Sequence, residues 1–194
     1  MIKPQGYDEL QINFTKKMIL PPDGYVCRIK NVEECESQRG TLQIRVQIDI
    51  AEGDYYAYWR NKWEEKLVDN RHAGYPKGGT IYISLYKNGN ESEGINSTFK
   101  AFCEAYKESN SIEVNWTATN WGNQFEGKYI GAVYRHRESE YKGHIYMQPE
   151  VAFWTSVDTI RNKTFKVPPT KYLQKPEEEY VADGFNAVED DIPF

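Results

Sequence analysis

Residues 42–50 alternate strictly between apolar and polar side chains, and this pattern constrains the fold more than any other in the chain. The apolar members are Leu42, Ile44, Val46, Ile48 and Ile50, and the polar members are Thr41, Gln43, Arg45, Gln47 and Asp49. Successive side chains of a strand point to opposite faces, so a period of two predicts a strand with one face in a core and the other in water. We therefore expect a β-protein with a one-sided sheet.

Further strands are predicted on both sides of this segment. Residues 25–32 alternate, the aromatic run 55–60 is typical of a strand that returns beside the second, and residues 80–86 are extended. A polar, partly helical excursion is expected at residues 61–79. Two more strands are predicted at residues 128–137 and 145–157, joined by a hairpin connection over residues 138–143.

One helix stands out between the third and fourth strands. Asn96 can cap its start, and Phe99, Phe102, Cys103 and Tyr106 form an apolar stripe at helical spacing. Five strands with a helix between the third and fourth is the order of the OB-fold, a small Greek-key barrel that binds oligonucleotides or oligosaccharides. We predict a mainly β, five-stranded OB-fold over residues 21–168. It is preceded by an N-terminal arm (1–20) and followed by a disordered acidic tail (169–194).

The charge is divided unevenly along the chain. The whole sequence has 24 Lys and Arg against 29 Asp and Glu, a net charge of −5, but residues 176–194 hold 7 acidic and no basic residues. The body before the tail therefore carries about +2. Such a weak positive charge favours a local groove over a global field as the way to attract a polyanion.

The sequence offers little for catalysis. The three histidines, His72, His136 and His144, lie far from any nucleophile elbow or HExxH pattern, and the three cysteines are too few and scattered for a disulfide framework or a zinc site. We expect a protein that is not an enzyme and needs no cofactor or metal. No segment has the roughly 18 apolar residues needed to span a bilayer, and no leader is evident, so we expect a cytoplasmic protein without membrane contact.

Aromatic and basic residues are the better candidates for function. Arg45 projects to the polar face of its strand, and the run at residues 55–60 places rings beside it. Rings stack on bases and cations neutralise phosphates, so this combination indicates a surface for single-stranded nucleic acid. The predicted binding residues are Arg45, Tyr55, Tyr58, Trp59, Arg60, Lys62, Trp63, Lys128, Tyr129, Tyr134, Arg135 and Arg137.

Other interpretations of the same residues stay open. Tyrosine and tryptophan are favoured in strands for packing alone, so each ring is equally a core candidate. An aromatic face also suits an oligosaccharide, and a recombination protein that anneals strands would need similar residues. These alternatives differ in their ligands, so competition between oligo-dT and soluble glycans, or a strand-annealing assay, separates them.

The acidic tail carries a family resemblance. Its last residues, Asp190, Asp191, Ile192, Pro193 and Phe194, resemble the tip with which bacterial single-stranded DNA-binding proteins dock replication and repair enzymes. The stretches 48–55, 99–110 and 160–168 are similar to single-stranded DNA-binding proteins of phages and mobile elements of Gram-positive bacteria. The resemblance implies a protein that coats single-stranded DNA in the bacterial host cytoplasm during replication or recombination. It also implies partner binding through residues 190–194 and a possible homodimer.

Overall fold

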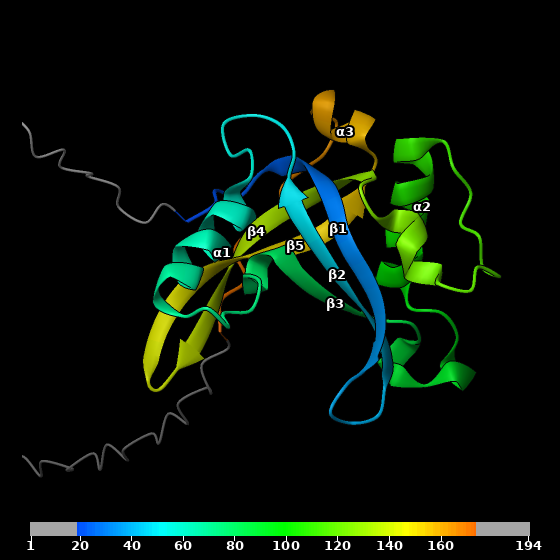
Figure 1. Ribbon diagram of the computed structural model, residues 1–194, viewed down its shortest axis with the longest axis horizontal. Coiled ribbons are helices and arrows are strands. Elements are labelled where there is room, and N and C mark those ends of the chain that lie inside the picture. The colour runs from blue at the N-terminus through cyan, green and yellow to red at the C-terminus, as the bar shows by residue number, and fades with distance from the viewer. Residues whose placement is uncertain (1–18, 174–194) are drawn as a thin grey trace, which may run out of the picture.

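A five-stranded antiparallel sheet forms the centre of the protein in the computed structural model, which describes residues 19–173 (Figure 1). The strands lie in the order β3-β2-β1-β4-β5, and β3 and β5 are not hydrogen-bonded to each other, so the sheet is open. The elements are β1 (Gly24–Glu36), β2 (Leu42–Ile50), α1 (Tyr58–Asp69), η1 (Lys77–Gly79), β3 (Thr80–Ser84), η2 (Lys87–Gly89), η3 (Glu91–Glu93), α2 (Ser97–Asn110), η4 (Trp121–Phe125), β4 (Tyr129–Tyr141), β5 (His144–Thr155) and α3 (Val157–Arg161).

The alternation of β2 sets the position of the core. Ile44, Val46, Ile48 and Ile50 are all buried, as the sequence predicts, and they join the main core cluster with residues from every strand. Burial of a side chain of this size stabilises the fold by about 1.5–3 kcal/mol. The mainly β class, the five strands and the position of α2 before the last two strands are confirmed, but a second long helix, α1, lies between β2 and β3.

Helix α2 covers one end of the sheet, as its apolar stripe predicts. The Asn96 side chain accepts a hydrogen bond from the Thr98 N–H and caps the helix. The four residues of the stripe are buried, and Phe102 packs edge-on against Trp154 of β5 with ring centroids 5.4 Å apart. In Figure 1, α2 and α1 lie toward opposite ends of the molecule.

The third strand is not where the sequence pattern placed it. Residues 55–60 form a turn and the start of α1, and the third strand is β3. The cause lies in β2, where the Asp49 carboxylate accepts hydrogen bonds from the N–H groups of Trp59 and Arg60. A carboxylate at this position satisfies the free donors of a helix N-terminus and favours its dipole, and this outweighs the strand preference of the aromatic run.

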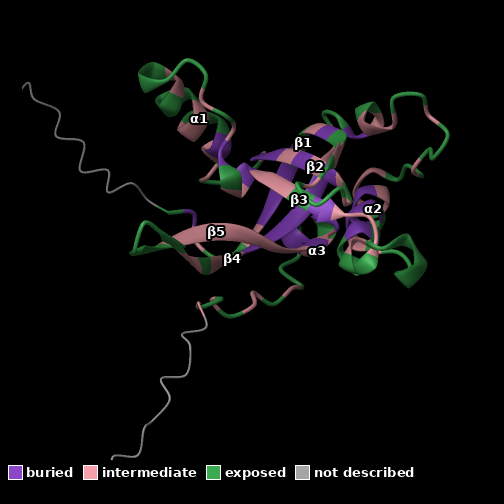
Figure 2. Ribbon diagram, turned by 90° about the horizontal axis from the view of Figure 1, so that it is seen from below, coloured by how far each residue is buried: buried purple, intermediate pink, exposed green. Residues whose placement is uncertain are grey.

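The last two strands form a hairpin longer than predicted. Its turn consists of Lys142 and Gly143, with φ of 52° and 77°, instead of the six residues expected. Two successive positive φ angles are what a two-residue type I′ turn requires. The hairpin extends away from the buried centre of the molecule, as the burial colours of Figure 2 show.

A second, smaller cluster lies on the outer side of β1 and β4. Val157 and Ile160 of α3 pack there with Val26 and Val133, and Phe165 and Val167 join them from the segment that follows. Farther along, Lys171 makes two backbone hydrogen bonds to β4, with His136 and Glu138. The chain after α3 is therefore part of the folded body up to residue 173. The predicted arm lies almost wholly in residues 1–18, and the predicted tip lies in 190–194; both are outside the described residues.

Candidate nucleic-acid interface

The polar sides of β2 and β3 form one continuous surface, which we call the β2–β3 wall. Its residues face one another in pairs, because directly opposed residues of an antiparallel ladder share a face. The pairs are Gln43 with Ser84, Arg45 with Tyr82, and Gln47 with Thr80. Arg45 and Tyr82 therefore stand side by side, an arginine next to a ring that is 59% exposed.

Arg45 is held in place by neighbours on both sides. Its guanidinium forms an ion pair with Glu33 of β1, and Tyr82 of β3 stands opposite it. Partial burial works to lower the pKa of Arg45, but its interactions with Glu33 and Tyr82 raise it above its ordinary value. The wall therefore presents a positive charge that is paired with one carboxylate.

Two polar atoms of the wall leave hydrogen-bonding capacity unused. The Nε of Arg45 and the Oγ1 of Thr80 are buried and have no hydrogen-bond partner in the part of the chain that the structure describes. Most buried polar atoms in native proteins have a partner, so such a pair on one surface is a reason to look for a ligand there.

Two predicted binding residues, Trp59 and Tyr134, lie in the core, and the expectation that they stack on bases is wrong for this structure. Trp59 is 3% exposed and Tyr134 is fully buried. The Trp59 indole N–H donates to the Tyr134 hydroxyl (3.1 Å), which donates to the carbonyl of Gly78 (3.0 Å). A Cβ on Gly78 would lie 2.2 Å from the Trp59 ring, so this glycine makes room for the indole. Burial raises the pKa of Tyr134 well above its usual value, which keeps the hydroxyl protonated as a donor.

The other predicted residues near α1 form a packed group. Tyr55 and Tyr58 are partly buried and meet edge-on with ring centroids 6.1 Å apart, and the Lys62 amine lies 5.0 Å from the Tyr58 ring. Trp63 is half-buried and donates its indole N–H to the Ala73 carbonyl (2.8 Å). Arg60 is exposed, with a loose ion pair to Glu64 on the next turn.

The predicted residues of β4 have partners of their own. Arg135 makes two hydrogen bonds to one oxygen of Glu150, at 2.9 and 2.7 Å, and Arg137 contacts the other oxygen at 3.2 Å. Tyr129 accepts a hydrogen bond from Arg28 (2.6 Å), whose guanidinium lies over its ring. Lys128 directly precedes the strand and is half-buried.

The structure therefore divides the predicted set among the β2–β3 wall, α1 and β4. Sequence reasoning missed Tyr82, the exposed ring beside Arg45. The signal was present, because Ile81 and Ile83 alternate with the outward Tyr82, and the same period-two rule that located Arg45 would have found it.

Two turns extend the interface. The β1–β2 turn holds Arg39. Exposed Tyr141 and Tyr146 lie on β4 and β5 close to the β4–β5 turn, and the Lys142 amine of that turn is 5.3 Å from the Tyr141 ring. Both turns point toward the lower part of Figure 1.

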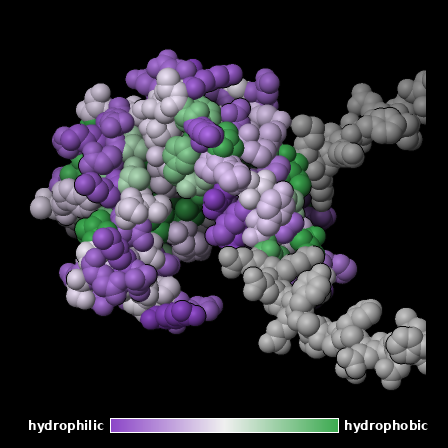
Figure 3. All heavy atoms as spheres, turned by 180° about the vertical axis from the view of Figure 1, so that it is seen from behind, coloured by the Kyte–Doolittle hydropathy of each residue, from purple (hydrophilic) through white to green (hydrophobic). Residues whose placement is uncertain are grey.

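Seen from behind, the molecule shows apolar side chains in the middle of the face and hydrophilic ones around them (Figure 3).

The overall charge of the described body is balanced. Residues 19–173 hold 20 Lys and Arg and 20 Asp and Glu. Any attraction for a polyanion must therefore come from local charges such as Arg45 and Arg39. Within residues 19–173, no cluster of three or more His, Cys, Asp and Glu side chains could hold a metal ion, and no helix is long and apolar enough to cross a membrane.

Comparison with known proteins gives no relative for this chain. No protein-family model matches the sequence, and no curated protein matches it.

Proposed function

We propose that this protein is an OB-fold single-stranded DNA-binding protein of the phage and mobile-element type, which coats exposed strands without reading their sequence. The observation that carries the proposal is the pairing of Arg45 with the exposed Tyr82 on the β2–β3 wall. A ring offers stacking to any base, and the neighbouring guanidinium offers charge to the phosphate beside it.

The topology supports the proposal. The order β3-β2-β1-β4-β5, with α2 between β3 and β4, is that of an OB barrel left open between β3 and β5. OB-folds bind oligonucleotides on the face of their second and third strands and on the loops between strands 1 and 2 and strands 4 and 5. By strand number, the β2–β3 wall and the turns beside Arg39 and Tyr141 correspond to these positions, and this correspondence supports the proposal.

Binding of a fluorescent oligo-dT at several salt concentrations tests the proposal. The full chain should bind at micromolar concentration or below, and its affinity should fall as salt rises, because bound phosphates release counterions. Tyr82→Ala should weaken binding by about 5- to 150-fold, which corresponds to about 1–3 kcal/mol for one stacked base. Arg45→Ala should reduce the salt slope by about one.

Matched controls come from exposed residues elsewhere in the fold. Tyr56 is 60% exposed, close to the 59% of Tyr82, and Arg161 is a surface arginine paired with a carboxylate, Glu52, as Arg45 is with Glu33. Tyr56→Ala and Arg161→Ala should leave both affinity and salt slope unchanged. Equal losses in the control and test variants, or no salt-sensitive binding at micromolar protein, would remove the basis for the proposal.

The proposed function includes recruitment of replication or recombination proteins through residues 190–194. A carboxylate-rich segment that ends in Phe194 suits an apolar pocket with a basic rim on a partner. A chain truncated after Lys175 should keep or improve its oligo-dT affinity and lose partner recruitment. Loss of oligo-dT affinity in the truncated chain would contradict this division of roles.

A further inference from the structure

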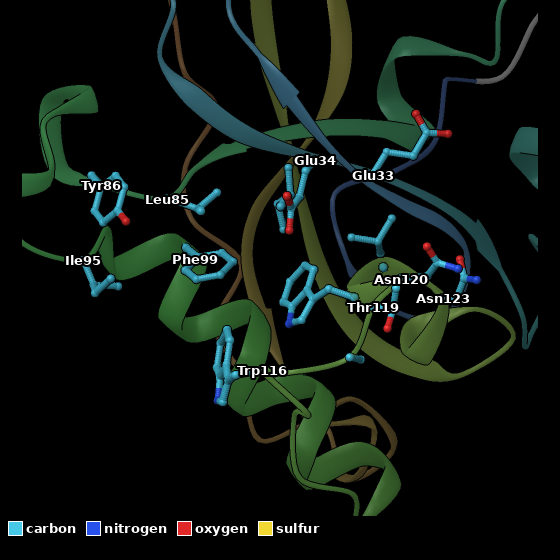
Figure 4. Close-up of a pocket in the computed structure, with 15 residues that line it drawn as sticks. Glu33, Glu34, Leu85, Tyr86, Ile95, Phe99, Trp116, Thr119, Asn120 and Asn123 are labelled. Atoms are coloured by element: carbon cyan, nitrogen blue, oxygen red, sulfur yellow. The ribbon is translucent and has the colours of Figure 1, made fainter.

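A cavity of about 720 Å³ lies outside the β2–β3 wall, where β1, the end of β3, α2 and the segment before η4 meet (Figure 4). Its walls combine aromatic and apolar side chains with polar ones, among them Glu34, Thr119 and Asn120. Phe99 of α2 and Trp116 lie on one side in Figure 4, and Glu34 points toward them from β1, whereas the Glu33 carboxylate points away, to the face on which it pairs with Arg45. The β2–β3 wall does not use this cavity.

Three rings form its apolar side. Trp116 and Trp121 stack with centroids 5.8 Å apart and an angle of 23° between their planes, and Phe99 lies within 6.3 Å of each. Trp116 is nevertheless 62% exposed, and Ile95 at the same cavity is 50% exposed. Exposed large apolar groups gathered around a concave surface are typical of interaction sites.

The charge of the cavity has one sign. Its lining includes Glu33 and Glu34 and no lysine or arginine. Glu33 is bonded to Arg45 and Asn31, whereas Glu34 is exposed and has no ion-pair or hydrogen-bond partner among residues 19–173. A carboxylate next to aromatic faces attracts organic cations and repels phosphate.

The aromatic side is already fixed in the unbound protein. A Cβ on Gly122 would lie 1.9 Å from the Val32 carbonyl oxygen, so the backbone next to Trp121 is in direct contact with β1. The Gln124 side chain donates to the carbonyls of Asn115 and Trp121, at 3.2 and 2.8 Å, and accepts from the Asn115 N–H (2.7 Å). A site ordered in this way loses less conformational freedom when a ligand binds.

We propose that this cavity is a docking site for a basic, apolar peptide segment of a partner protein. A lysine or arginine side chain of the segment lies against Trp116 and Glu34, and an adjacent apolar side chain packs on Ile95 and Phe99. Charge complementarity favours this occupant over single-stranded DNA, whose phosphates would meet the unpaired carboxylate of Glu34, and over an acidic segment such as residues 176–194. The proposal does not depend on single-stranded DNA binding at the β2–β3 wall.

The test uses the full chain labelled with ¹⁵N and follows the indole N–H signals of its tryptophans by NMR. The probe is a six-residue peptide of alternating leucine and lysine, and the matched control peptide alternates leucine and glutamate. We expect the basic peptide to shift the Trp116 and Trp121 signals in a saturable way and to leave the Trp63 signal in place. The acidic peptide should shift none of them.

Two substitutions sharpen the test. Glu34→Gln removes an exposed charge and should weaken the affinity for the basic peptide at least threefold. Glu126 is an exposed glutamate outside the cavity, and Glu126→Gln should leave this affinity unchanged. Trp116→Ala should abolish the shift of Trp121, with circular dichroism confirming that the variant folds. The proposal is overturned if both peptides bind equally, or if the Glu34→Gln variant binds the basic peptide as tightly as the wild type does. It is also overturned if the basic peptide at millimolar concentration shifts no indole signal, or if oligo-dT gives the saturable Trp116 shift instead.

Discussion

Replacing Tyr134 by phenylalanine separates a core role of this residue from a base-stacking role. The substitution keeps the ring and removes the hydroxyl, which accepts from the Trp59 indole (3.1 Å) and donates to Gly78 (3.0 Å). The buried Trp59 indole N–H and the part-buried Gly78 carbonyl then lose their partners, and a fully buried orphaned group costs about 1–3 kcal/mol, a part-buried one less. We expect Tyr134→Phe to lower the free energy of unfolding by about 2–4 kcal/mol and the melting temperature by about 5–15 °C.

Urea titration followed by tryptophan fluorescence and circular dichroism measures this change. The denaturant slope should stay constant, because the same surface is exposed on unfolding. Tyr56→Phe removes a hydroxyl from a ring that is 60% exposed and should change stability by less than about 0.5 kcal/mol. Oligo-dT affinity of folded Tyr134→Phe should match that of the wild type. A loss below about 0.5 kcal/mol would refute the buried chain of hydrogen bonds, because two orphaned polar groups cost more than this.

Two further predictions concern the β2–β3 wall and the thiols. Glu33→Gln removes the ion-pair partner of the Arg45 guanidinium. Because an exposed ion pair is worth about 0.2–1 kcal/mol, oligo-dT should bind up to about fivefold more tightly in anisotropy titrations. Weaker binding would show that Glu33 supports the site and does not compete with DNA for Arg45. Burial raises the pKa of the Cys103 thiol to about 12, so only about one molecule in 10,000 has this thiol as thiolate at pH 8. Burial raises the pKa of the fully buried Cys27 thiol further. Titration of the native protein with a thiol-specific reagent should therefore modify only Cys35, and rapid reaction of all three cysteines would contradict the burial of the other two.

Local sequence patterns correctly predicted those strands and helices whose conformation and burial follow from their own side chains. The alternation of β2 places Ile44, Val46, Ile48 and Ile50 in the core, although Leu42 at its start is exposed, and all four residues of the α2 stripe are buried. The strand predicted for residues 55–60 was wrong because the conformation of this segment depends on Asp49, which caps α1 from a neighbouring strand. An aromatic run has no feature of its own that reveals a remote helix cap.

The candidate site was predictable to the extent that strand parity was used. Arg45 was placed correctly on the polar side of β2, and parity would also have found Tyr82. Tyr134 and Arg135 are neighbours in β4 and therefore point to opposite faces of the sheet. The prediction that both bind DNA on one exposed face conflicts with this alternation. The burial of Trp59 was beyond the sequence pattern, because it depends on how α1 docks and on the space left by Gly78.

The absence of a hydrogen-bonded ladder between β3 and β5 has a mechanical consequence. At this seam η1 contacts β5, and Trp59 fills the space between Gly78 and Tyr134. One buried indole ring therefore links these two ends of the open sheet in a place where no strand pairing does. A smaller side chain at position 59 would remove this contact and leave the hydrogen-bonded pairs of the sheet as they are.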